Sequence, residues 1–194
     1  MATERYHHGD LRAVLLEEAE RSIARDGVDA LSLRQLARDV GVSHAAPARH
    51  FRDKQALLDA LALHGFQEMN RRMVDAATGP GELLAKFRGV ARAYLGFAVE
   101  HPQLLDVMYS TKHHPEASEQ LKEVAHESMA ATESLLRAAM DAGVITEASP
   151  AVLARVAFAS VHGLAVLAAG DLLDGMPADD LLDATVDTLL RGFT

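Results

Sequence analysis

The residues with the clearest chemical use are the arginines and histidines of the segment SLRQLARDVGVSHAAPARHF, residues 32 to 51. Between residues 34 and 55 there are five basic residues and only two acidic ones, and His44 and His50 lie there as well. An arginine such as Arg49 presents a fixed fork of donors that fits two acceptors on a guanine edge or the oxygens of a phosphate. This composition favours binding to nucleic acid, although solvated helix faces often carry as much positive charge.

The same segment carries the signals of two short helices joined by a tight turn. Ser32 and Gln35 form a capping-box pattern, in which each side chain satisfies the other residue's free backbone donor. Gly41 can adopt the left-handed conformation that ends a helix, and Ser43 is placed to cap the second helix. Between Ser32 and Gly41 lies an apolar stripe at helical spacing, formed by Leu33, Leu36, Ala37 and Val40. We therefore predict a helix-turn-helix unit that reads DNA, with an ordinary helical hairpin as the alternative.

The net charge of −9 argues at first against a DNA-binding protein. The charge is unevenly distributed, however, because residues 1 to 55 contain nine basic and nine acidic residues. The rest of the chain therefore carries the whole negative excess. This polarity predicts that the end with the helix-turn-helix pattern faces the phosphates of DNA.

The ten histidines of the chain raise the question of metal chemistry. His7–His8 and His113–His114 are adjacent pairs, which point to different faces of a helix, and no two histidines lie four residues apart. There is no cysteine, no phosphate-binding glycine loop and no nucleophile elbow. We predict no metal site, no cofactor and no enzyme, with a histidine-based metal-dependent sensor or enzyme as a minor alternative. We expect His162 to be the one buried histidine, as a core or pocket residue.

The elements that must position these residues all have helical periodicity. We predict an all-α fold with about nine helices, divided into a helix-turn-helix DNA-binding domain at 1–54 and an effector-binding and dimerisation domain at 55–194. The predicted helices span about 10–27, 32–40, 43–51, 53–77, 82–99, 101–109, 116–142, 149–169 and 178–192.

The last two predicted helices are apolar on more than one side. In the first of them, apolar residues cover most of the helix circumference: Val156, Phe158, Val161, Leu164, Val166 and Leu167. A helix that is apolar all round must be buried on all sides, so we expect a partner subunit to cover it. Burial within one subunit is the alternative. No uninterrupted apolar run is long enough to cross a bilayer, and the first residues contain no apolar secretory segment. We therefore expect a soluble cytoplasmic protein with no membrane partner.

These motifs resemble the TetR family of bacterial transcriptional regulators. The resemblance rests on LSLRQLARDVGVS, on the short second helix ending in RHF, and on DKQALLDAL, which opens a long helix. The start YHHGDLR and Val161–His162–Gly163 are similar to a branch whose C-terminal domain has a Trp-His-Gly signature, with valine in place of tryptophan here. The resemblance implies a homodimer joined by the last two helices as a four-helix bundle. It also implies a third helix in the major groove of double-stranded operator DNA, and association with the bacterial nucleoid.

The resemblance also implies particular DNA contacts. An N-terminal arm near the minor groove and the second helix beside the backbone supply Arg5, Tyr6, Ser32 and Arg34. The third helix and the residues after it supply Ser43, His44, Ala45, Arg49, His50 and Lys54, of which His50 and Lys54 match phosphate contacts. For Arg49, a base contact and a phosphate contact are both open. Two residues depart from the family, Ala48 in place of a phosphate-binding Tyr and Pro47 in place of Leu, and Pro47 is expected to loosen the start of the helix.

A small-molecule cavity is expected in the second domain. Gly89 and Gly96 lie seven residues apart on one helix face and serve either close helix crossing or open space. The candidate cavity residues are Phe87, Tyr94, Phe97, Met108, Tyr109, Met129, Phe158 and His162, although residues of these types are individually more often plain core. This lining favours an apolar or aromatic effector with one or two polar anchors. The predicted function is a repressor released from its operator by that effector. Activation stays open, and a helical protein-interaction module without a DNA target is the alternative.

Overall fold

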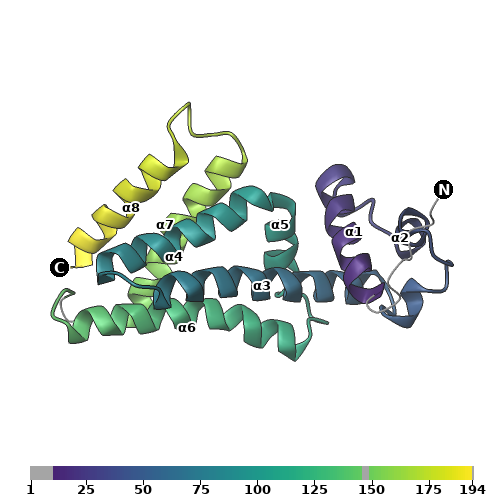
Figure 1. The fold of residues 1–194 in the computed structure, drawn as a ribbon, viewed down its shortest axis with the longest axis horizontal. Coiled ribbons are helices and arrows are strands. Elements are labelled where there is room, and N and C mark those ends of the chain that lie inside the picture. The colour runs from purple at the N-terminus through teal and green to yellow at the C-terminus, as the bar shows by residue number, and fades with distance from the viewer. Residues whose placement is uncertain (1–10, 146–148, 194) are drawn as a thin grey trace.

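The computed structural model describes residues 11–145 and 149–193, and over these residues all of the regular secondary structure is helical (Figure 1). Eight α-helices and one short 3-10 helix, η1, are present in the described residues. The prediction of an all-α fold with about nine helices is confirmed. The elements are α1 (Leu11–Asp26), α2 (Leu33–Val40), η1 (Pro47–Arg49), α3 (Lys54–Thr78), α4 (Leu83–Glu100), α5 (Pro102–Thr111), α6 (Glu119–Asp141), α7 (Pro150–Ala169) and α8 (Ala178–Phe193).

The first two helices and η1 form a small unit at one end of the elongated molecule (Figure 1). Its interior is apolar, with Ile23 of α1, Leu36 of α2 and Phe51 after η1 each no more than 2% exposed. The guanidinium of Arg12 lies 5.6 Å from the centre of the Phe51 ring and covers the edge of this core. These contacts fix α2 and η1 in place against α1.

The long helix α3 runs from this unit into the rest of the molecule (Figure 1). It begins at Asp53, whose carboxylate accepts a hydrogen bond from the Ala56 N–H at 2.8 Å. Its apolar residues Leu61, Phe66 and Met69 are almost completely buried against α4, α5 and α6. Because α3 packs against α1 as well as against α4, α5 and α6, a tilt of this helix would move the small unit relative to the other helices. The domain boundary at residue 54 stays a prediction.

Gly65 marks the closest approach of α3 to α5. A methyl group added there would lie 2.6 Å from the sulfur of Met108, which is itself fully buried. Gly89 packs more loosely, since an added methyl group would lie 3.4 Å from the Ala76 side chain, and Gly96 has open space within 4 Å. One of the two glycines singled out in the sequence therefore serves a helix crossing, and the other does not.

The close contact at Gly65 and the open space at Gly96 predict that alanine has opposite effects on stability at these two positions. Gly65→Ala is expected to lower the free energy of unfolding by about 1–2 kcal/mol, because overpacking outweighs the better helix propensity of alanine. Gly96→Ala, the matched control, is expected to raise it by roughly 0.5–1 kcal/mol. Urea denaturation at a fixed protein concentration measures both. Equal stability of the two variants would contradict the close contact with Met108.

The helix α7 leaves one apolar stripe uncovered. Its opposite face is buried, including Leu153, Val161 and Leu164. The uncovered stripe is defined by residues spaced four or three apart, Val152, Val156, Ala159, Gly163, Val166 and Leu167, all of which are exposed. The alternative of complete burial within one subunit is therefore wrong for this face. By length and composition α7 could also cross a membrane, which for a single helix is weak support for a membrane span.

Candidate functional site

The turn between α2 and η1 has the predicted geometry. The Ser32 hydroxyl accepts a hydrogen bond from the Gln35 N–H at 3.2 Å. Gly41 has a φ of 76°, in the left-handed region, and the Val42 N–H donates to the Ala37 carbonyl at 2.9 Å. The return half of the capping box is absent, because the Gln35 amide oxygen accepts from Arg38 and its amide nitrogen donates to Asp39, one turn along, at 2.7 Å. The cap is thus made by Ser32 alone.

The segment after the turn differs from the predicted short α-helix. Residues 44–46 form a turn, and only Pro47–Arg49 are helical, as a single 3-10 turn. Pro47 has no N–H to donate back to the carbonyl of Ser43, which instead accepts from the Ala46 N–H at 2.9 Å. The helix cap is Ala46, with no side-chain hydrogen bond, so the expected cap by Ser43 is wrong.

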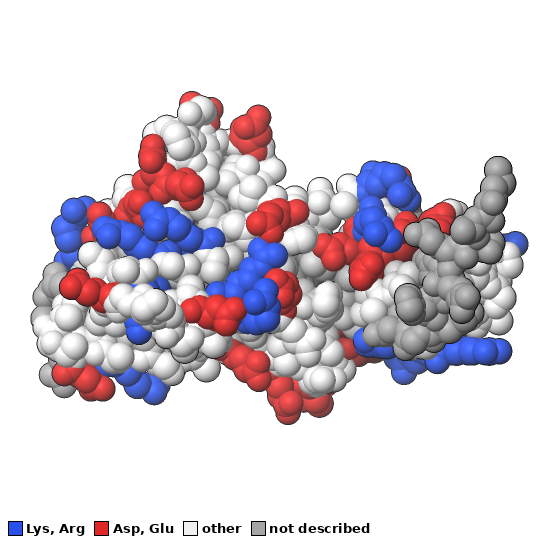
Figure 2. Space-filling view, viewed as in Figure 1, with Lys and Arg blue, Asp and Glu red and all other residues white. Residues whose placement is uncertain are grey.

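The predicted DNA-contacting side chains nevertheless lie on the surface of this end. Pro47 is buried, whereas six of the predicted DNA-contacting residues in or next to α2 and η1 are exposed: Ser32, Arg34, Ser43, His44, Arg49 and His50. Ala45 is exposed as well, and Arg5 and Tyr6 lie outside the described residues. Figure 2 shows Lys and Arg atoms along the lower edge of this end, while acidic and basic atoms are interspersed over the rest of the same face.

Lys54 has a structural role that its sequence position did not indicate. Its ammonium donates to the backbone carbonyls of Val28 at 2.7 Å and Asp29 at 3.2 Å. The side chain therefore fastens the loop between α1 and α2 to the first turn of α3. A phosphate contact by Lys54 stays a prediction, and it would use the remaining donor of the ammonium.

A cavity of about 140 Å³ lies among α3, α4, α6, α7 and α8, with the end of α5 at one side. Five of the eight candidate cavity residues line it: Phe87, Tyr94, Tyr109, Met129 and Phe158. The other three do not line it. Phe97 is 1% exposed and packs beside His101, with the ring centres 5.0 Å apart. Met108 lies against Gly65, and His162 lies beside the aromatic wall.

The aromatic wall of the cavity contains two buried phenols. The Tyr94 hydroxyl lies 2.7 Å from His162 Nδ1 and 3.2 Å from the Tyr109 hydroxyl. Burial raises the pKa of Tyr94 and of Tyr109, so both hydroxyls stay protonated. His162 is half-buried rather than fully buried, and burial together with the charge of Lys112 lowers the pKa of its imidazole. Neutral hydroxyl dipoles are therefore the polar anchors on this side.

Sequence reasoning missed the polar members of the lining, which are Lys112, Ser128 and Thr132. The Lys112 ammonium lies 4.3 Å from the centre of the Tyr109 ring. Because Lys112 follows Tyr109 by three residues, the two side chains share a helix face, and this spacing was the available signal. Ser128 is held by Asn70 of α3, to which its hydroxyl donates.

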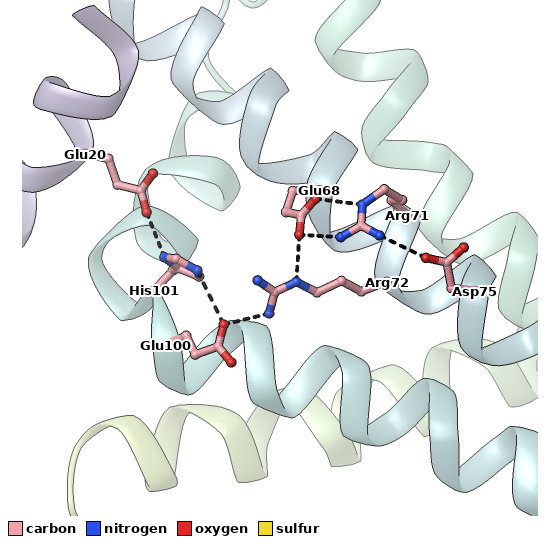
Figure 3. Close-up of polar contacts among 7 residues, drawn as sticks. All are labelled: Glu20, Glu68, Arg71, Arg72, Asp75, Glu100 and His101. Carbon is pink, nitrogen blue, oxygen red and sulfur yellow. Dashed lines mark hydrogen bonds and ion pairs between the residues drawn. The ribbon is translucent and has the colours of Figure 1, made fainter. Parts of the chain in front are cut away.

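A chain of polar contacts connects the small unit of α1, α2 and η1 to the helices of the cavity (Figure 3). His101, between α4 and α5, has its Nδ1 2.7 Å from the Glu20 carboxylate on α1. Its Nε2 lies 3.6 Å from Glu100, which accepts a hydrogen bond from Arg72 of α3 at 2.6 Å. Arg72 also donates to Glu68 at 2.9 Å. Hydrogen bonds from Arg71 and Arg72 lower the pKa of Glu68 to about 2, so this carboxylate is ionised at neutral pH.

Comparison with known proteins agrees with this geometry. The family model described as bacterial regulatory proteins of the tetR family matches residues 15–61, and the model of the tetracyclin repressor-like C-terminal domain matches residues 87–193. The chain is 31% identical over 152 residues to the HTH-type transcriptional repressor Rv1474c of Mycobacterium tuberculosis, a match that covers 77% of this chain and 76% of the relative.

Solved structures have the same fold. A protein of unknown function from Rhodococcus sp. RHA1 is 48% identical, with a TM-score of 0.91 over 98% of this chain and 99% of that one. FadR from Bacillus subtilis, solved with stearoyl-CoA, is 15% identical, with a TM-score of 0.78 over 94% of this chain and 99% of that one. The second similarity shows the fold alone. The two family models and the curated relative together show that this chain belongs to the TetR family and is a DNA-binding transcriptional repressor.

Proposed function

We propose that this repressor is a homodimer that binds a near-palindromic operator and releases it when an apolar or aromatic small molecule occupies the cavity. Regulators of this family are soluble, dimeric and cytoplasmic, and they bind operator DNA and small-molecule effectors. The observation that carries the proposal is the path of α3. The side chain of its first residue, Lys54, donates a hydrogen bond to the loop between α1 and α2 in the DNA-binding unit. Met73, near the other end of α3, lines the cavity.

The uncovered stripe of α7 supports dimerisation through the last two helices. Val152, Val156 and Val166 are between 42% and 57% exposed, and Ala159 and Gly163 between them are small enough for a second helix to approach closely. A second copy of α7 and α8 would cover the stripe and complete a four-helix bundle. This arrangement would fix the distance between the two DNA-binding units.

Release then requires a change in that distance. Two half-sites on one face of DNA are separated by about 34–36 Å, so a shift of a few ångströms spoils simultaneous docking. A ligand that spreads α4, α6 and α7 would tilt α3, against which α4 and α6 pack. The contacts from Glu20 through His101 and Glu100 to Arg72 would carry the same motion to α1 (Figure 3).

The test is fluorescence anisotropy on the promoter beside the repressor's own gene, with a thermal-shift screen of apolar compounds to find the effector. We expect a sequence-specific complex that weakens with salt, and at least one stabilising compound that dissociates it. Saturating operator should weaken binding of that compound by the same factor by which the compound weakens operator binding. A protein that shows no sequence-specific binding at low salt would contradict the proposal and favour the protein-interaction alternative.

The polar contacts in Figure 3 give a separate prediction about coupling. Glu20→Gln removes the charge that faces His101 and is expected to reduce the coupling between effector and operator by roughly 0.5–2 kcal/mol, with effector affinity unchanged. Glu17→Gln is the control, since Glu17 is exposed one turn earlier on α1. Operator affinity with and without effector measures the coupling. The same coupling in both variants would exclude this route.

A further inference from the structure

The wall of the cavity is mostly apolar. Most of the lining consists of aliphatic and aromatic side chains from α4, α6, α7 and α8. The exceptions are the hydroxyls of Tyr94, Tyr109, Ser128 and Thr132, and the ammonium of Lys112. Of the described residues that line the cavity, Lys112 is the only charged one. A ligand in this cavity therefore meets a strongly asymmetric environment.

The Lys112 ammonium has no carboxylate partner among the described residues. Its neighbours are the rings of Tyr109 at 4.3 Å and Phe66 at 5.7 Å. Burial lowers the pKa of Lys112, and no opposite charge compensates. An incompletely solvated cation held only by ring faces is poorly stabilised, so a negative charge brought beside it would be favoured.

We propose that the effector is an amphiphile with a single negative charge, a carboxylate that binds the Lys112 ammonium while its apolar body fills the rest of the cavity. This inference rests on the proposed function and names the class of ligand. One cation calls for one charge, because a second charge on a phosphate head would remain unpaired in a lining whose only charged side chain, among the described residues, is Lys112. The protonated Tyr109 hydroxyl can donate to the second carboxylate oxygen.

The size of the cavity limits the apolar body. Its volume of about 140 Å³ is close to the ~150 Å³ of an engineered apolar cavity that binds benzene. The cavity therefore has about the size of a single ring or a short alkyl chain, and a longer apolar body would have to spread the surrounding helices. Octanoate is a suitable probe, with octanamide and octylamine as neutral and cationic partners of nearly the same shape.

Calorimetric titration of the full-length protein without DNA tests the assignment. We expect octanoate to bind at least tenfold more tightly than octanamide, and octylamine to bind weakest. Lys112→Met should lower octanoate affinity roughly 10- to 100-fold, as expected for a lost charge-assisted bond, and leave octanamide affinity within threefold. Lys112→Arg should retain most of the octanoate affinity. Lys122→Met, which removes a lysine paired with Glu119 on the surface, should change neither.

Several results would overturn the assignment. Equal affinity for octanoate and octanamide would exclude a role for the charge, and so would octanoate binding that Lys112→Met leaves intact. Failure of all three octyl probes to bind would exclude this ligand class altogether. If octanoate binding depends on Lys112 but leaves operator affinity unchanged, the ligand class stands and the proposed release of DNA fails.

The pH dependence supplies a second readout. Octanoate affinity should fall as the pH rises through the lowered pKa of Lys112, because the neutral amine loses its attraction for the carboxylate. The other titratable groups nearby are Tyr94 and Tyr109, whose raised pKa values keep them neutral, and His162 and Asp106. The Lys112→Met protein should lack this alkaline loss of affinity. An identical alkaline loss in both proteins would contradict the assignment.

Discussion

Replacement of Val156 and Val166 by glutamate is expected to give a monomer that has lost specific operator binding. Both valines are exposed in the single subunit, at 42% and 51%, and both lie on the uncovered stripe of α7. In the proposed dimer they would meet the same stripe of the partner, where four carboxylates would be buried without counter-ions. A monomer can occupy only one half-site, so operator affinity should fall toward the non-specific level, roughly a thousandfold or more.

Light scattering after size-exclusion chromatography reports the mass, and fluorescence anisotropy reports operator affinity. Val74→Glu is the matched control, because Val74 is 44% exposed on α3, away from the stripe. The control should remain a dimer with unchanged operator binding, and circular dichroism should show that both proteins are folded. A double variant that remains a dimer would exclude α7 as the interface.

The features that could be predicted from the sequence are those fixed by neighbouring residues. The Ser32 cap and the left-handed Gly41 each depend on two to four adjacent positions, and the structure has both. The return bond of the capping box failed for an equally local reason. Asp39 lies one turn after Gln35 and accepts from its amide nitrogen, while the Gln35 amide oxygen, which would have accepted from the Ser32 N–H, accepts from Arg38 instead.

In the second helix of the helix-turn-helix, the missing N–H of Pro47 outweighs the helical spacing of the sequence. Its sequence has helical spacing, and Pro47 was expected only to loosen its start. In the structure the missing N–H of Pro47 leaves a turn followed by one 3-10 turn, in which the Pro47 carbonyl accepts from both His50 and Phe51 at 2.9 Å. The exposed residues that are expected to contact DNA nonetheless stay at the surface of this end, because the buried Pro47 and Phe51 fix the segment to the core.

The cavity could be predicted only in part, because helical periodicity identifies a buried face but not what that face contacts. Phe97 and Tyr94 lie on the same helix and are both about 5% exposed or less, yet only Tyr94 lines the cavity. Which of the two faces open space depends on where α6 and α7 cross. Lys112 escaped notice for a different reason: lysines are nearly always at the surface, and its spacing of three residues from Tyr109 was the one signal that the sequence offered.

Arg49→Ala is expected to lower operator affinity by roughly 1–3 kcal/mol and to relax the preference at one base position. Arg49 is exposed on η1, at the surface that the helix-turn-helix presents to DNA. Its guanidinium can take the two acceptors of a guanine edge, which distinguishes that base from the other three. Anisotropy against operators with single substitutions measures the effect. Arg21→Ala is the control, since Arg21 pairs with Glu18 on α1.

The comparison with Lys54 decides which kind of contact Arg49 makes. A phosphate contact weakens all sequences alike and flattens the slope of affinity against salt by about one unit, and this is the result expected for Lys54→Ala. Because the Lys54 ammonium also holds the Val28 and Asp29 carbonyls, that variant should lose stability as well, which urea denaturation would detect. Arg49 makes no such contact in the described residues, so Arg49→Ala should leave stability unchanged. If Arg49→Ala weakens every operator equally and flattens the salt slope, then Arg49 binds phosphate, and the bases are read by other residues of the exposed surface.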